Sequence, residues 1–157
     1  MKRIVLSNFI KVALILVILG LIGVLIGLYS YSFTMVKENP ELAHMRLPVF
    51  GLCVGILGSP IIACILGFLA LIYYGNGRLF YEKTGRYLVY TGHCFILGVL
   101  FLGGLFVYTA MNVAGSITNL YVMVGIFIYL LVGAIFYLLG DVIAQGKALQ
   151  EDHDLTI

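Results

Sequence analysis

Residues 12–33 read VALILVILGLIGVLIGLYSYSF and contain no charged side chain. A helix needs about 20 predominantly apolar residues to cross the hydrocarbon core of a bilayer, and this run is long enough. Lys2, Arg3 and Lys11 precede the run, as basic residues precede a secretory signal. The apolar core of a signal is only about 7–15 residues long, so we expect a retained transmembrane helix instead.

Three further apolar runs follow, at about 47–74, 87–111 and 120–140. They are continuous, whereas the strands of a membrane barrel alternate between apolar and polar residues. The chain is 62% hydrophobic and 10% charged, while soluble domains are about a quarter charged. We therefore predict an all-α fold, a bundle of four transmembrane helices, as a single integral membrane domain over 1–157 with a cytoplasmic tail at 141–157.

The distribution of Lys and Arg predicts the orientation. The N-terminal segment, the middle loop and the tail contain Lys2, Arg3, Lys11, Arg78, Lys83, Arg86 and Lys147, whereas the other two loops contain only Lys37 and Arg46. Cytoplasmic segments carry the excess of basic residues. We expect both termini and the middle loop in the cytoplasm of a bacterial cell, with the chain in the cytoplasmic membrane.

Small residues predict where the helices pack, because they allow close approach of two backbones in a membrane. Gly23 and Gly27 form one Gly-x-x-x-Gly pair, Gly51 and Gly55 form another, and Gly133 lies in the fourth run. The simpler interpretation is packing between helices of one chain. A face for a homo-oligomer is the alternative.

His93 is the strongest single candidate for a functional residue inside the membrane. It lies six residues into the third run, at a depth of about 9 Å for a rise of 1.5 Å per residue. An ionisable group at that depth suggests a proton or pH sensor. The simpler alternative is a neutral imidazole that bonds to a neighbouring helix or reaches the interface. Replacing His93 with Phe should abolish any pH response and leave expression intact.

Two cytoplasmic stretches are candidate contacts for a partner or for lipid head groups. The middle loop carries Arg78, Lys83 and Arg86 among aromatic residues, a composition that suits anionic lipid or a docking surface. Its plainer interpretation is a topology signal. The tail ends with Asp154, Leu155, Thr156 and Ile157, and an apolar end behind acidic residues suits a groove or a sheet edge of a partner. Most chain ends are simply disordered.

No motif for catalysis, nucleotide or metal is present. Cys53, Cys64 and Cys94 lie in apolar runs without a Cys-x-x-Cys pair, which favours buried packing residues over a zinc or disulfide site. The net charge of +2 is too small to indicate direct nucleic-acid binding. We expect no cofactor, no metal and no enzymatic activity.

Two stretches resemble a known family. The end, Glu151-Asp152-His153-Asp154-Leu155-Thr156-Ile157, and the middle stretch, Phe80-Tyr81-Glu82-Lys83-Thr84-Gly85-Arg86, are similar to the bacterial four-helix membrane proteins called domain of unknown function 2975. His153 departs from the usual Asn or Glu. The resemblance implies no chemistry. It implies a context, because members are often encoded beside a small helix-turn-helix regulator of the Cro/CI type.

Two functions of different classes follow. The first is a non-enzymatic membrane regulator or sensor that engages a cytosolic partner, for which the resemblance suggests a helix-turn-helix transcription factor. The second is a small transport or immunity protein against a membrane-active peptide or compound, in which the outer loop from Lys37 to Arg46 and the interior of the helix bundle would matter and the tail would not.

Overall fold

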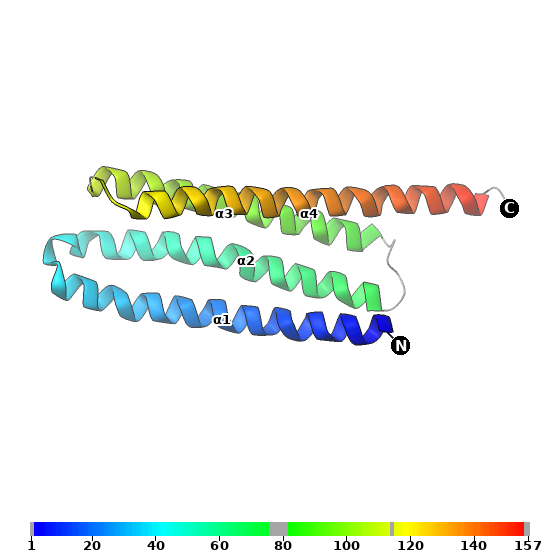
Figure 1. Ribbon diagram of the computed structural model, residues 1–157, viewed down its shortest axis with the longest axis horizontal. Helices are drawn as coiled ribbons and strands as arrows, with labels where there is room; N and C mark the ends of the chain where they lie inside the picture. The colour runs from blue at the N-terminus through cyan, green and yellow to red at the C-terminus, as the bar shows by residue number, and fades with distance from the viewer. Residues whose placement is uncertain (1, 76–81, 114, 156–157) are drawn as a thin grey trace.

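Four long helices and one short 3-10 helix make up the chain in the computed structural model (Figure 1). The structure describes residues 2–75, 82–113 and 115–155, and the side chains of 5–72, 84–113 and 115–146. The helices are α1 (Lys2–Glu38), η1 (Pro40–Met45), α2 (Arg46–Gly75), α3 (Glu82–Asn112) and α4 (Thr118–Leu155). All four α-helices are long and apolar enough to span a membrane, and the described residues contain no strand. The chain is therefore an all-α, multi-pass membrane protein.

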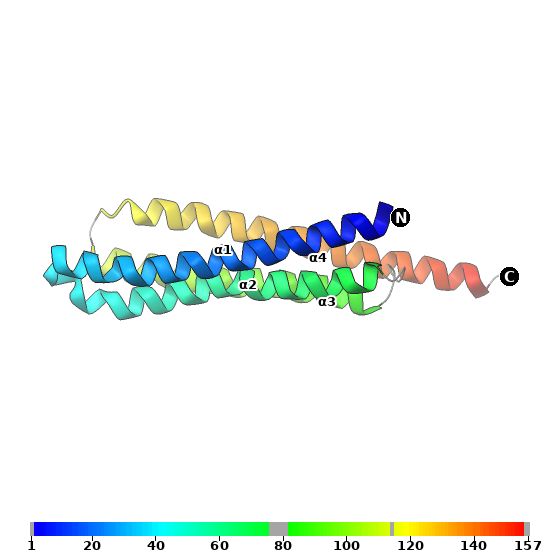
Figure 2. The same ribbon diagram turned by 90° about the horizontal axis from the view of Figure 1, so that it is seen from below.

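The helices run antiparallel along one long axis. Figures 1 and 2 show both termini at one end of the bundle, with η1 and the α3–α4 connection at the other. Proline at the first position of η1 and a glycine with positive φ, Gly115 (φ 69°), turn the chain at this second end. We refer to it as the η1 end.

Two helices extend far beyond the apolar runs that predict them. α1 has 37 residues and α4 has 38, which correspond to about 56 Å of helix each, against a hydrocarbon core of about 30 Å. Helical hydrogen bonding does not stop where the hydrocarbon ends, so the apolar run marks the membrane span and not the helix. α4 continues as helix for fifteen residues past Gly140, and its C-terminal part projects beyond the other three helices (Figure 1).

The helices pack in chain order. α2 contacts α1 and α3, α3 contacts α4, and among the described residues α1 packs only against α2 and η1. The bundle is therefore open between α1 and α4. Its small core lies towards the η1 end, where Leu102 and Leu105 of α3 meet Val122 of α4.

Glycines bring α3 and α4 together. A Cβ added at Gly92 would lie 3.2 Å from the carbonyl oxygen of Gly133, and one at Gly140 would lie 3.3 Å from that of Gly85. Gly85 and Gly92 are separated by the same interval as Gly133 and Gly140, so the two pairs meet in register across the antiparallel helices. A Cβ at Gly133 would lie 3.5 Å from the carbonyl oxygen of Gly92, so Gly133 lies in this contact.

The other four predicted packing glycines differ in what surrounds them within this chain. Gly55 of α2 faces the ring of Phe101, which a Cβ would overlap. At Gly23, Gly27 and Gly51 a Cβ would meet nothing within 4 Å, so these three do not pack helices of this chain together. Gly-x-x-x-Gly spacing marks a face of a helix, and it does not determine whether that face meets another helix.

A proline and a tyrosine tie α2 to α4. Pro60 lies inside α2 and has no N–H, so the carbonyl of Ile56, four residues earlier, lacks its helical partner. The hydroxyl of Tyr129 in α4 donates to that carbonyl at 2.8 Å. Tyr129 reaches across α3 because Gly98 leaves room: a Cβ there would overlap the tyrosine ring and lie 3.1 Å from Ser59 Oγ.

Candidate functional site

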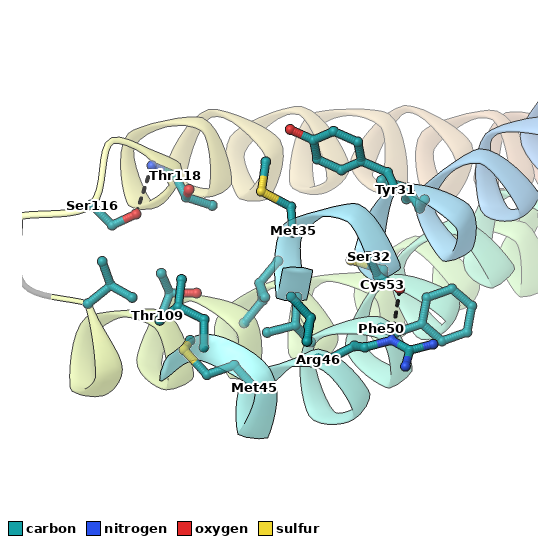
Figure 3. A pocket seen from close by; sticks show the side chains of 16 residues that line it. Tyr31, Ser32, Met35, Met45, Arg46, Phe50, Cys53, Thr109, Ser116 and Thr118 are labelled. Carbon is teal, nitrogen blue, oxygen red and sulfur yellow. Dashed lines mark hydrogen bonds between the residues drawn. The ribbon is translucent and has the colours of Figure 1, made fainter. Parts of the chain in front are cut away.

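A cavity of about 480 Å³ lies at the η1 end, between α1 and the beginning of α4 (Figure 3). Its floor is formed by the first turns of α2 and the last turns of α3. Most of its lining is apolar, and the side chains with hydroxyl groups are those of Tyr31, Ser32, Thr109, Ser116 and Thr118. The size falls within the range of about 300–1,000 Å³ that is usual for small-molecule sites.

Arg46, the first residue of α2, is the charged residue that lines this cavity. Its Nε donates to Ser32 Oγ at 3.1 Å, and Ser32 donates in turn to the carbonyl of Tyr29 at 2.6 Å. The guanidinium carbon lies 3.4 Å from the centre of the Phe33 ring and 5.7 Å from that of Tyr29. These distances are within the range of cation–π attraction.

The aromatic residues around Arg46 come from two helices. Tyr29 and Phe33 are one helical turn apart in α1 and make an edge-on contact at 5.1 Å, and Tyr29 also lies 5.3 Å from Phe50 of α2. Residues four apart share one face of a helix, which explains why both rings meet the same guanidinium. The cluster fixes the direction of a long side chain that would otherwise sample many rotamers.

The two connections at the η1 end are joined by His44. Its Nε2 lies 3.3 Å from Oδ1 of Asn112, the last residue of α3, and its Nδ1 lies 3.0 Å from the carbonyl of Glu41. The Asn112 amide nitrogen donates to the Tyr108 carbonyl at 2.8 Å, so its oxygen faces the histidine. η1 is thereby held against the end of α3 beside the cavity.

His93 lies on the outer surface of α3 and not in the bundle interior. Its Nδ1 is 2.9 Å from the carbonyl of Val89 in its own helix, and its ring makes an edge-on contact with Tyr137 of α4 at 5.2 Å. Because a carbonyl only accepts hydrogen bonds, Nδ1 carries the hydrogen in this contact. The imidazole thus bonds to a carbonyl of its own helix and contacts α4 only through the edge of its ring.

The predicted cytoplasmic contacts are only partly described. Arg86 is exposed on α3 and makes an interaction there. Lys83, Asp154 and Leu155 lie within helices, but their side chains are outside the described part, as are Arg78, Thr156 and Ile157 altogether. The tail and the beginning of α1 lie at one end of the bundle, whereas the cavity lies at the other (Figure 1).

Sequence reasoning did not identify the cavity or the role of Arg46. In the sequence, Arg46 counts only as one of the basic residues of a loop, because no local motif shows that α2 begins there. The available signal was the pair Tyr29 and Phe33, spaced to share a helix face at the end of the first apolar run. Thr109 and Ser116 are distant in sequence, and only the fold brings them to the same cavity.

A family model described as "Protein of unknown function (DUF2975)" matches residues 30–157. The matched region begins within α1 and includes every residue that lines the cavity except Leu28. This match confirms the family resemblance that was based on residues 80–86 and 151–157. Neither the curated proteins nor the solved structures contain a match.

Proposed function

The chain belongs to the DUF2975 family, whose description assigns no activity, and from that premise we propose a non-enzymatic membrane regulator or sensor that engages a cytosolic partner. The observation that carries this proposal is the length of α4. One helix continues from Thr118 to Leu155, fifteen residues past the apolar run, and its C-terminal part extends beyond the other helices (Figure 1). A helix that projects from the membrane offers a preformed surface to a partner.

The chemistry of the projecting segment supports this role. Residues 141–157 carry Asp141, Lys147, Glu151, Asp152 and Asp154 beside apolar residues, as a docking helix does. The segment is continuous with the membrane span: Gln145 donates to Asp141 at 2.8 Å, one turn apart. We propose that both termini lie in the cytoplasm of a bacterial cell, as the Lys and Arg distribution predicts. The proposed partner is a small helix-turn-helix regulator.

The test compares the full chain with a chain that lacks residues 151–157, each purified in mild detergent from the native host with its bound proteins. Substitution of Glu41 with Gln at the η1 end is a matched control, because it changes one acidic residue at the opposite end of the bundle. We expect a cytosolic DNA-binding protein to co-purify with the full chain and the control but not with the truncated chain. If the partner still co-purifies with the truncated chain, residues 151–157 are not its binding site.

The cavity favours a second candidate function, a small transport or immunity protein acting on a membrane-active peptide or compound. The cavity is lined by Leu42, Met45 and Arg46, which belong to the segment 37–46 on which that function would depend. Resistance to such a compound that is lost on substitution of Leu42 or Arg46, and kept without residues 151–157, would favour this candidate over the regulator.

A further inference from the structure

The charge of Arg46 is incompletely satisfied within the described chain. Of the five N–H donors of a guanidinium, the structure pairs Nε with Ser32, and the planar face rests on the Phe33 ring. Neither Glu38 nor Glu41, the acidic residues of this end, forms an ion pair with it in the described structure. A guanidinium in this position presents the donor geometry that binds a carboxylate through two parallel hydrogen bonds.

The lining beside Arg46 is hydrocarbon. Leu28, Met35 and Val36 come from α1, Val49 from α2, and Leu105 from α3. Leu105 is 8% exposed and Thr109, one turn further along α3, is 6% exposed, so the floor is firmly packed. A purely polar ligand would leave these apolar surfaces uncovered, and a purely apolar one would add no hydrogen bond to the guanidinium beyond the one to Ser32.

The open side of the bundle determines how a ligand reaches the cavity. α1 and α4 do not pack against each other in the described chain, and the cavity lies between them. In a protein that spans a bilayer, this opening faces lipid. A ligand that enters there arrives from the membrane with its apolar part among acyl chains and its polar part near the helix ends.

We propose that the cavity binds a single-chain amphiphile with a carboxylate head, a fatty acid, with the head on Arg46 and the chain between α1, α2 and α3. Charge complementarity selects the anionic head, and a cavity of about 480 Å³ suits one chain and not the two of a phospholipid. The same cavity supports the second candidate function, but fatty-acid binding requires neither transport nor resistance. It also does not depend on whether the projecting helix binds a partner.

The test uses the full chain in phosphatidylcholine nanodiscs and a palmitic acid probe that carries a photoreactive diazirine and an alkyne tag. We expect the label on peptides that contain Cys53 or Leu105, with competition by unlabelled palmitate. Arg46→Gln should lower labelling about tenfold, the loss that corresponds to removing one charge-assisted hydrogen bond. Lys37→Gln is the matched control, because Lys37 is an exposed cation of the same end that does not line the cavity, and it should label like the wild type.

Two further arms keep the result interpretable. Cys53→Phe fills the cavity without changing any charge, so it should also lower labelling if the chain occupies this space. A probe with an alcohol in place of the carboxylate should label weakly and be indifferent to Arg46→Gln. Labelling spread evenly over lipid-facing helices, or unchanged by both substitutions, would overturn the proposal. An anionic phospholipid probe with the same dependence on Arg46 would overturn the assignment to a single-chain ligand.

Discussion

The hydrogen bond from Tyr129 to Ile56 gives the sharpest prediction about the fold. Replacing Tyr129 with Phe keeps the ring beside Gly98 but removes the hydroxyl that donates to the Ile56 carbonyl at 2.8 Å. Pro60 has already taken away the helical donor of that carbonyl, so the substitution leaves a backbone acceptor without a partner. Interhelical hydrogen bonds in membranes contribute about 0.6 kcal/mol on average and up to about 1.7, and an unpaired buried acceptor costs about 1–3 kcal/mol.

We therefore expect Tyr129→Phe to lower the free energy of unfolding by about 1–2 kcal/mol. The second substitution, Pro60→Ala, restores an N–H at the position from which α2 can bond Ile56. In that background the cost of Tyr129→Phe should fall below about 0.5 kcal/mol, because the carbonyl no longer depends on the hydroxyl. Tyr121→Phe is the control, since Tyr121 lies exposed at the beginning of α4, and it should have little effect.

The assay is steric trapping in bicelles, which measures unfolding of a membrane protein without an intrinsic tryptophan signal, and this chain has none. The four variants form a double-mutant cycle. An equal cost of Tyr129→Phe with and without Pro60 would refute the reasoning, because the tyrosine would then not be replacing the donor that proline removes. A negligible cost in the wild-type background would refute it too.

Two more outcomes follow from the packing. Gly92→Ala and Gly103→Ala both increase helix propensity. A Cβ at Gly92 would lie 3.2 Å from a backbone oxygen, whereas one at Gly103 would meet nothing within 4 Å. The Gly92 variant should therefore have a free energy of unfolding about 1–3 kcal/mol lower than that of the Gly103 variant in the same assay. Equal values would mean that α3 and α4 are not in close contact at Gly92. Asn112→Ala removes the side-chain oxygen that lies 3.3 Å from His44 Nε2, so amide exchange across residues 40–45 should become several times faster, and unchanged exchange would show that this contact does not hold η1.

The sequence predicts the membrane-spanning helices well because their signal is local. Continuous apolar runs such as 47–74 identify a membrane span without knowledge of its neighbours, and α2 covers 46–75. The ends of α1 and α4 are not predicted in this way, because hydropathy reports the hydrocarbon boundary and not helical hydrogen bonding.

Contacts between helices are predicted less well, since they depend on which faces meet. Gly51 and Gly55 form one Gly-x-x-x-Gly pair, but a Cβ at Gly55 would overlap the Phe101 ring, whereas one at Gly51 would meet nothing within 4 Å. Arg46 shows the same limit for the candidate site. Its charge is visible in the sequence, but its rings, its serine and the cavity beside it come together only when α1 and α2 pack.

A cytosolic partner can reach the projecting end of α4 only if that end lies in the cytoplasm, as proposed above. The direct measurement is labelling with a membrane-impermeant maleimide in intact cells, using a chain whose three native cysteines are replaced and a single cysteine is introduced at Glu41 or at Gln145. Both positions are exposed. The account predicts that the cysteine at 41 is labelled in intact cells and the cysteine at 145 only after permeabilisation. Labelling at 145 in intact cells would contradict it.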